Sequence, residues 1–242
     1  MLPATSVTED EIHNLHKILL PKMLPRAGYK FNFPYAVAFA PQEFLGVGIK
    51  HLKAIHLALQ VEMLLKHVRA NNSVGKTAEI MIQWAQKVTR IAKPVLEDRK
   101  QLPHLEGGWV ANIRDGLITC NAKKRATKPW TMLHQRVNDQ HIMDIIRNDQ
   151  RLSDLQVTQL NYCRLYLRVE LLSDITTSDG QRLIPLIYKQ KDGKQLDNQV
   201  HNKKWPTQGK PNPTTWKLWN KTILQLWTEG NVRLRKPLGP WK

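Results

Sequence analysis

Seven acidic side chains in the C-terminal half come closest, by type and spacing, to a catalytic set. They are Asp139, Asp144, Asp149, Asp154, Glu170, Asp174 and Asp179. Clustered carboxylates hold the magnesium ions of two-metal nucleases and polymerases, but spacing alone does not cluster these. Asp139, Asp144 and Asp149 are spread around helical turns, and Asp179 precedes a turn glycine. Solvation and helix capping therefore explain most of them, and no catalytic residue is predicted.

Two glycine-containing segments have parts of nucleotide-binding motifs but not their full patterns. Gly75-Lys76-Thr77 stands at a helix start, yet a phosphate-binding loop needs a strand before it and glycine where Ala70 stands. Gly46 and Gly48 begin a dinucleotide-binding pattern that fails at His51, so we interpret them as turn glycines. No cofactor is predicted.

The histidines and cysteines lack a metal-binding pattern. His13 and His16 share one helical face and a second group lies on another, but neither group has an acidic or cysteine partner. The second group comprises His51, His56 and His67. Cys120 and Cys163 have neither CxxC nor Cys/His spacing, so we expect reduced, partly buried thiols and no metal site.

Positive charge is the strongest functional signal. The chain has 37 Lys and Arg against 20 Asp and Glu, a formal net charge of +17. Such a surplus requires a polyanion, and nucleic acid is the commonest one. An anionic membrane is the rival, but Leu2 stands where myristoylation needs glycine. No apolar stretch reaches the roughly 18 residues of a membrane span, and no secretory signal is present, so we predict an intracellular protein, nuclear or cytoplasmic, without a membrane partner.

The charge is concentrated in the C-terminal half. Residues 1–121 carry a net +5, residues 122–242 a net +12, and residues 189–242 a net +9 together with five tryptophans. These are Trp205, Trp216, Trp219, Trp227 and Trp241. Cations that follow the backbone and rings that stack on bases are typical of a polynucleotide groove, whereas a basic tail with tryptophan anchors is the alternative. The predicted nucleic-acid-binding residues are Lys123, Lys124, Arg125, Lys128, Lys203, Lys204, Trp205, Lys217, Arg233, Arg235 and Lys236.

Local patterns predict mostly helices. Thr8 and Glu11 have capping-box spacing before a first helix, which Pro21, Pro25 and Gly28 should end or kink. Aromatic residues then alternate over 29–35, which predicts an extended segment. All four Phe lie between positions 31 and 44, and we favour core packing for them over base stacking.

Further apolar periodicities predict the remaining elements. They are a helical hairpin over 52–68 and 80–91, a helix over 109–117, a short helix over 142–146, a Ser153-capped helix to 171, a strand over 183–188 and a last helix from Thr214 or Thr215. We therefore predict a mainly α fold with a minor β component. A helical bundle-like part over 1–122 should precede a smaller, basic, Trp-rich α+β part over 123–242, because the basic link begins at Lys123.

Short segments along almost the whole chain form a distinctive ordered set. They are Leu2-Pro3-Ala4-Thr5, Leu24-Pro25-Arg26-Ala27-Gly28-Tyr29, Phe39-Ala40-Pro41, Leu45-Gly46-Val47-Gly48-Ile49, Leu52, Arg136 to Asp144, Asn161-Tyr162-Cys163-Arg164-Leu165-Tyr166-Leu167, Leu172-Ser173-Asp174-Ile175 and Trp205-Pro206. In this set the chain resembles the region after the palm in reverse transcriptase-like proteins of retroelements, which are non-LTR-like proteins abundant in diatoms and other microbial eukaryotes.

The resemblance implies a thumb-like or post-thumb helical module that grips template and primer backbone. Polymerases of that family carry an aromatic-x-Asp-Asp palm motif, whereas this chain has no Asp-Asp pair. We therefore expect a nucleic-acid-binding fragment or remnant, not an enzyme, with a polymerase-bearing chain as a further candidate partner. A metal-dependent nuclease or integrase-like enzyme using some of Asp139, Asp144, Asp174 and Asp179 is one alternative. A basic protein-interaction module is the other.

Overall fold

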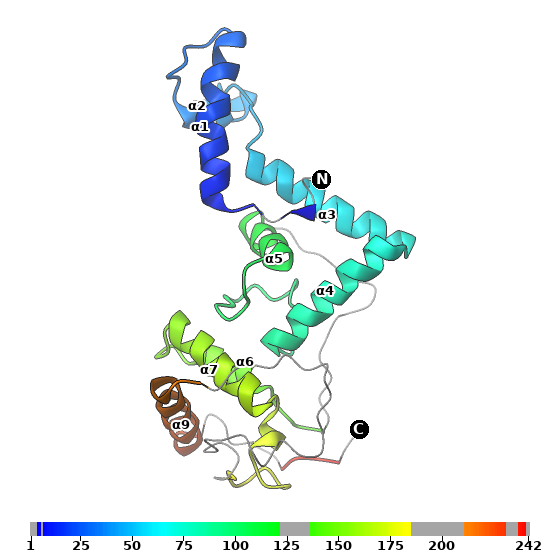
Figure 1. Ribbon diagram of the computed structural model, residues 1–242, viewed down its shortest axis with the longest axis vertical. Coiled ribbons are helices and arrows are strands. Elements are labelled where there is room, and N and C mark those ends of the chain that lie inside the picture. The colour runs from blue at the N-terminus through cyan, green and yellow to red at the C-terminus, as the bar shows by residue number, and fades with distance from the viewer. Residues whose placement is uncertain (1–3, 6, 122–135, 185–210, 231–236, 241–242) are drawn as a thin grey trace. The chain divides into compact units, whose positions relative to one another are not determined.

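The computed structural model describes residues 4, 5, 7–121, 136–184, 211–230 and 237–240 (Figure 1). Over these residues the protein is mainly α-helical, as predicted. The elements are α1 (Glu9–Arg26), α2 (Tyr35–Phe39), η2 (Gln42–Phe44), α3 (Leu52–Ala70), α4 (Ser73–Thr89), α5 (Trp109–Thr119), α6 (Ile142–Asn148), α7 (Asp154–Leu167), η3 (Leu172–Asp174) and α9 (Pro213–Thr228). The minor β component of the described residues includes two isolated antiparallel bridges, His141 with Leu171 and Thr176 with Leu183. None of the described helices is long and apolar enough to cross a membrane.

The contacts divide the chain into two units. Unit 1 comprises Met1–Met81 and Gly107–Lys123, and unit 2 comprises Ile82–Glu106 and Lys124–Lys242. The boundary predicted at 122/123 falls beside one of these divisions, but residues 82–106 group with the C-terminal part. The division into two separate domains, 1–122 and 123–242, stays a prediction.

In unit 1, helix α1 begins at the predicted capping box and ends at Arg26, between the predicted breakers Pro25 and Gly28. The Thr8 side chain accepts from the Glu11 backbone N–H, and the Glu11 carboxylate accepts from the Thr8 backbone N–H at 2.8 Å. Pro21 and Pro25 both lie inside the helix, which ends one residue after Pro25 and before Gly28, whose φ is 85°. Leu20 and Leu24, which bracket Pro21, are buried, so packing of this side outweighs the backbone bonds that the prolines remove.

The extended segment predicted over 29–35 is wrong. The chain turns at Phe31 and enters the short helix α2 after Pro34, whose fixed φ suits a helix start. Core packing holds for Phe33 and Phe39, which pack against the small cluster of Leu20, Leu24 and Ala38. It fails for Phe31 and Phe44, which are 69% and 77% exposed.

Helices α3, α4 and α5 confirm the predicted helical segments. The hairpin prediction pairs α3 with α4, whereas most contacts of α3 are with α1 and α5. Asn71, with φ of 49°, ends α3 in the left-handed conformation. Gly75 lets α4 start beside the end of α3, because a Cβ there would lie 2.1 Å from the His67 carbonyl oxygen. Its backbone N–H donates to the Asn72 side chain at 3.0 Å. The sequence Gly75-Lys76-Thr77 thus serves helix packing.

Unit 2 is built around one apolar core that α6, α7 and α9 share. The buried side chains include Ile142, Met143, Ile146, Val157, Leu160, Cys163, Trp216, Trp219, Ile223, Leu226 and Trp227. Ser153 starts α7 with a capping box in which Gln156 is the partner, as predicted for its N-terminus. Helix α7 ends at Leu167 and not near 171, because Arg168 adopts a left-handed φ of 60°.

The chain leaves α7 to pair with the start of α6. The Ile142 backbone N–H donates to the Glu170 carbonyl at 3.1 Å, and the Leu172 N–H donates to the Gln140 carbonyl at 2.8 Å. These long-range bonds replace the helical bonds that residues 168–171 would otherwise make. Of the strand predicted over 183–188, Leu183 forms a single bridge, and residues 185–188 lie outside the described residues.

Side-chain hydrogen bonds attach residues 90–98 to unit 2. The Gln86 amide donates to the carbonyls of Ile91 and Lys93 at 2.7 and 2.8 Å, and its oxygen accepts from the Val95 N–H. The Asp144 carboxylate accepts from the Ala92 N–H at 2.8 Å. The Gln86 bonds satisfy backbone groups that no helix satisfies, and the Asp144 bond connects this segment to α6 in the C-terminal part.

The two cysteines provide a test of the core. Cys163 is fully buried and burial raises its pKa to about 12, whereas Cys120 at the end of α5 is exposed. We expect a thiol reagent such as Ellman's reagent to modify one cysteine per folded chain and the second only in denaturant. The variant Cys120→Ser should remove the fast reaction. Fast modification of Cys163 in this variant would contradict the packing of α7 on α9.

Candidate nucleic-acid interface

The predicted binding residue that the structure describes is Lys217, on helix α9. The other ten predicted residues lie outside the described residues: Lys123, Lys124, Arg125, Lys128, Lys203, Lys204, Trp205, Arg233, Arg235 and Lys236. Helix α9 lies between two of these groups in the sequence, since Lys203 to Trp205 precede it and Arg233 to Lys236 follow it. Among the described residues, α9 is therefore the element that lies in the middle of the predicted basic segment of the sequence.

Helix α9 has one apolar side and one basic side. Asn212 caps it by accepting from the Thr215 N–H at 2.7 Å, and Pro213 occupies the first helical position. Its apolar side packs on α7, where the rings of Trp216 and Tyr166 meet edge to face with centroids 6.3 Å apart. The Cys163 thiol also approaches the Thr215 carbonyl at 3.6 Å. The burial of this side fixes which residues face outward.

The outward side of α9 carries two lysines one turn apart. Its exposed positions are Pro213, Thr214, Lys217, Lys221, Leu224 and Thr228, and none of these residues is acidic. Residues four apart on a helix lie on the same side, so the two ammonium groups project from one surface. Sequence reasoning selected Lys217 and missed Lys221, although the four-residue spacing was the signal that could have found it. The pair can hold two phosphates of one backbone.

The tryptophans of α9 are not part of this exposed surface. Trp216, Trp219 and Trp227 are 7%, 0% and 9% exposed, so their rings pack in the core. The prediction that they stack on bases is wrong, and the alternative of tryptophan anchors holds for these three. Trp205 and Trp241 lie outside the described residues. The described part of α9 therefore offers lysine ammonium groups, and not aromatic rings, to an anionic partner.

Arg151, near the end of α9, does not extend the basic side. It lines an open pocket of about 350 Å³ with Asp149 and Glu229. Its guanidinium forms ion pairs with both carboxylates, at 2.7 and 2.6 Å. These pairs lower the pKa of Asp149 and of Glu229 and raise that of Arg151. The charge of Arg151 is already balanced, so this pocket is a weaker phosphate site than the lysine pair.

The acidic residues of the nuclease alternative are separately engaged. Asp144 pairs with Arg147 at 2.9 Å, and Arg147 also pairs with buried Asp98 at 2.5 Å. Asp179, which is exposed, accepts from the Gln181 backbone N–H at 3.0 Å in the predicted turn. Asp154 starts α7 and accepts from the Gln101 amide at 2.8 Å. Among the described residues, no three His, Cys, Asp or Glu side chains lie close enough to hold a metal ion.

Two of these carboxylates do interact electrostatically, Asp139 and Asp174. The Asp174 carboxylate accepts from the backbone N–H groups of Glu170 and Leu171, both at 2.8 Å. Asp139 accepts from the Ser173 N–H at 3.1 Å through one oxygen. Burial, followed by the nearby charge of Asp139, raises the pKa of Asp174 to about 6. A proton can therefore reside on this carboxyl in mildly acidic solution.

A buried arginine pair faces these acids. Arg90 forms an ion pair with Glu170, and burial lowers its pKa to about 10. Arg164 is fully buried, and burial together with the charge of Arg90 lowers its pKa to about 9. Its guanidinium donates to Asn161 on its own helix and to the backbone carbonyl of Val88 at the end of α4. Both arginines stay charged at neutral pH, so this cluster links α4, α7 and the loop that follows α7.

No protein-family model matches the sequence, and no curated protein or solved structure matches it either. The resemblance to retroelement reverse transcriptase-like proteins therefore stays a prediction. The proposed function rests on the positive charge of the C-terminal half and on the exposed lysines of α9.

The raised pKa of Asp174 predicts a pH effect on stability. The folded pKa of about 6 lies above the ordinary value of 3.8, so the native state binds a proton that the unfolded state does not. The contribution of Asp174 to the free energy of unfolding should rise as pH falls from about 7 to about 4. We expect Asp174→Asn to flatten this rise, by about 2–3 kcal/mol, in urea unfolding followed by tryptophan fluorescence.

Asp179→Asn is the matched control for this measurement. Asp179 is exposed and the Thr177 hydroxyl lowers its pKa, so its contribution to stability is present at neutral pH and is lost only in more acidic solution. Asp179→Asn should therefore leave the pH dependence between about pH 7 and about pH 4 unchanged. An identical pH dependence for the wild type and Asp174→Asn would contradict the raised pKa.

Removing the Arg164 guanidinium should destabilise unit 2. The variant Arg164→Met leaves the part-buried Val88 carbonyl and the buried Asn161 amide oxygen without their donor. We expect a loss of about 2–4 kcal/mol in the free energy of unfolding. Arg182→Met, at an exposed position, should change it much less. Equal stability of the two variants in urea would show that the buried arginine has no structural role.

Proposed function

We propose that the protein binds nucleic acid through phosphate contacts made by its basic C-terminal part, with the exposed side of α9 at the centre. One observation carries the proposal. In the half of the chain with a net charge of +12, a packed helix directs Lys217 and Lys221 to solvent from a side without acidic residues. A lysine pair held by a packed helix loses less conformational entropy on binding than the same residues in an unstructured tail.

The burial of the three α9 tryptophans supports a specific mode of binding. Lysine contacts to phosphate release counterions and give affinity without reading the base sequence. Rings that stack on bases would favour single strands, but those of Trp216, Trp219 and Trp227 lie in the core. We expect α9 to bind with strong salt dependence and little sequence preference.

The resemblance to the region after the palm of retroelement reverse transcriptase-like proteins supports the same function. Within this proposal the chain is a module that grips template or primer backbone, and a polymerase-bearing chain supplies any catalysis. We place this function inside the cell, in the nucleus or the cytoplasm, where template nucleic acids are found.

Replacing both lysines should lower the number of phosphates contacted. We expect Lys217→Ala/Lys221→Ala to reduce the slope of log affinity against log salt by about 2, since each contact contributes about 0.9. The measurement is fluorescence anisotropy with single-stranded, duplex and hybrid oligonucleotides across a salt series. Lys66→Ala/Lys76→Ala is the matched control, because it removes two exposed lysines from α3 and α4. The control should retain the wild-type slope.

The other outcomes separate the alternatives. Equal slopes for both double variants would place the contacts elsewhere than α9. The absence of binding by the wild type at low salt would contradict nucleic-acid binding and favour an acidic protein partner. Cleavage of the oligonucleotides in magnesium would favour a nuclease and direct attention to Asp139 and Asp174.

A further inference from the structure

Helix α1 has an apolar side that unit 1 leaves uncovered. Leu15, Ile18, Leu19 and Met23 are 44%, 57%, 37% and 47% exposed. Leu15, Ile18 and Leu19 form a continuous stripe, with Met23 at its edge next to the packed side. Such a stripe marks an interaction surface more often than scattered exposed residues do.

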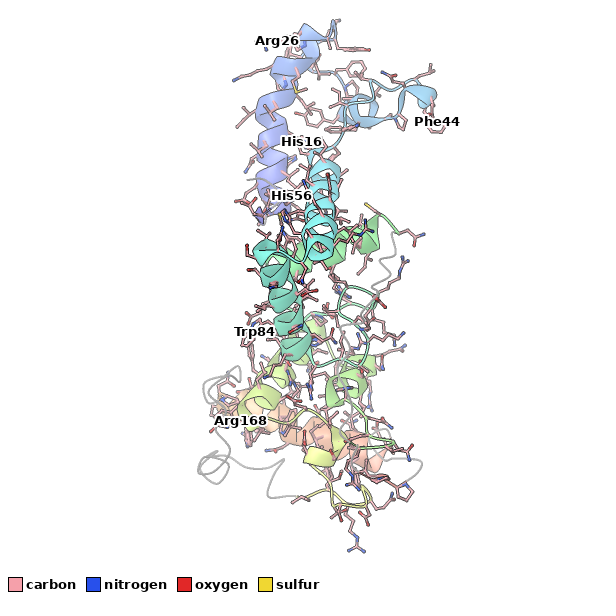
Figure 2. The ribbon with its side chains drawn as sticks, turned by 90° about the vertical axis from the view of Figure 1, so that its right-hand side faces the viewer. His16, Arg26, Phe44, His56, Trp84 and Arg168 are labelled. Carbon is pink, nitrogen blue, oxygen red and sulfur yellow. The ribbon has the colours of Figure 1, made fainter. Side chains whose placement is uncertain are left out.

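The opposite side of α1 is already occupied within unit 1. Ile12, His16, Leu20 and Leu24 are buried. The His16 ring packs on Phe39 and His51, with centroids 4.9 and 4.4 Å away, and its Nε2 accepts from the Leu52 N–H at the start of α3. Figure 2 shows His16 on the side of α1 next to α3, with Arg26 at the far end of the helix. The stripe is therefore a second side, separate from the packed one.

Charged residues bracket the stripe with opposite signs. Placed at about 100° per residue, the exposed residues of this side fall within an arc of roughly 100° around the helix. From the N-terminal to the C-terminal end they are Glu11, Leu15, Ile18, Leu19, Lys22 and Arg26. The side thus begins with an acidic residue, is apolar in the middle and ends with two basic residues.

We propose that this side of α1 pairs with the same side of a second copy of the chain, antiparallel, to form a homodimer. With a two-fold axis between Ile18 and Leu19, Glu11 of one copy lies beside Lys22 and Arg26 of the other, and the apolar centres meet. A parallel arrangement places like charges beside each other at both ends. The same surface is complementary to itself only in the antiparallel arrangement, which is the requirement for a two-fold interface.

The length of the paired α1 surfaces, which form the seam of the dimer, sets the strength of association. From Glu11 to Arg26 the helix rises about 22 Å, so the interface belongs to the small, transient class. Opposite charges at its two ends fix the orientation and the register more than they add affinity. The inference is independent of nucleic-acid binding, because it involves no residue of α9.

A charge placed in the seam tests the surface. The full-length wild type should show concentration-dependent dimer formation in sedimentation equilibrium, and Ile18→Glu should weaken it more than tenfold by bringing two carboxylates together at the axis. Ile80→Glu is the matched control, since Ile80 is an equally apolar residue, 64% exposed, on α4. It should associate as the wild type does, and circular dichroism should show unchanged helix content in both variants.

Disulfide cross-linking tests the orientation. In a Cys120→Ser background, Ile18→Cys places two thiols next to each other across the axis. Met23→Cys places them roughly 13 Å apart along the helices, beyond the reach of a disulfide. We expect oxidation to give a covalent dimer for Ile18→Cys only.

Three outcomes would overturn the proposal. The first is a wild type that stays monomeric at every concentration, which assigns the stripe to a different partner. The second is equal loss of association in Ile18→Glu and Ile80→Glu. The third is equal cross-linking of the two cysteine variants, which requires a parallel pair.

Discussion

The burial of the apolar side of α9 against α7 is the constraint on which the functional surface depends. Trp219 and Ile223 are almost fully buried, and the ring of Trp216 meets Tyr166 at its edge. A helix with such large side chains on one side has a single favourable rotation about its axis. That rotation directs Lys217 and Lys221 to solvent and removes the tryptophans from it. Within the proposed function, the core packing thus favours phosphate contacts over base stacking for this helix.

Helix α7 provides the platform for α9, and a buried polar cluster holds α7 in place. Arg164 bonds to the last turn of α4, while Arg90 at the end of α4 pairs with Glu170 beyond α7. Buried charges are tolerated only when they are paired and hydrogen-bonded, so the three segments must meet in one arrangement. Asp174, with its raised pKa, is the member of this cluster that responds to mild acid. The position of the exposed lysines therefore depends on ionic contacts in the interior of unit 2.

Sequence reasoning succeeded where local interactions decide the structure. The capping boxes at Thr8 and Ser153 marked two helix starts, and the mainly α class followed from apolar periodicity. It failed where distant residues decide it. Helix α7 ends at Leu167 and not near 171 because the residues that follow it pair with the start of α6. The segment with which they pair cannot be identified from local spacing.

The candidate site was predictable only in part, because which residues of a helix face solvent depends on packing between distant segments. Charge density identified the C-terminal part and Lys217, but interleaved Trp and Lys residues do not show by themselves which set faces water. The helical spacing distinguishes the two sets, because Trp216, Trp219 and Ile223 lie on one side of the helix while Lys217 and Lys221 lie on the other. Lys221 was missed because each charge was considered by its density and not by its side of the helix.

Lysine acetylation with and without bound oligonucleotide, measured by mass spectrometry, tests the central claim most directly. If the exposed side of α9 contacts phosphate, a saturating duplex should protect Lys217 and Lys221, while Lys66 and Lys76 in unit 1 should react at unchanged rates. Unchanged reaction of Lys217 and Lys221 in the presence of bound oligonucleotide would contradict α9 as the binding surface.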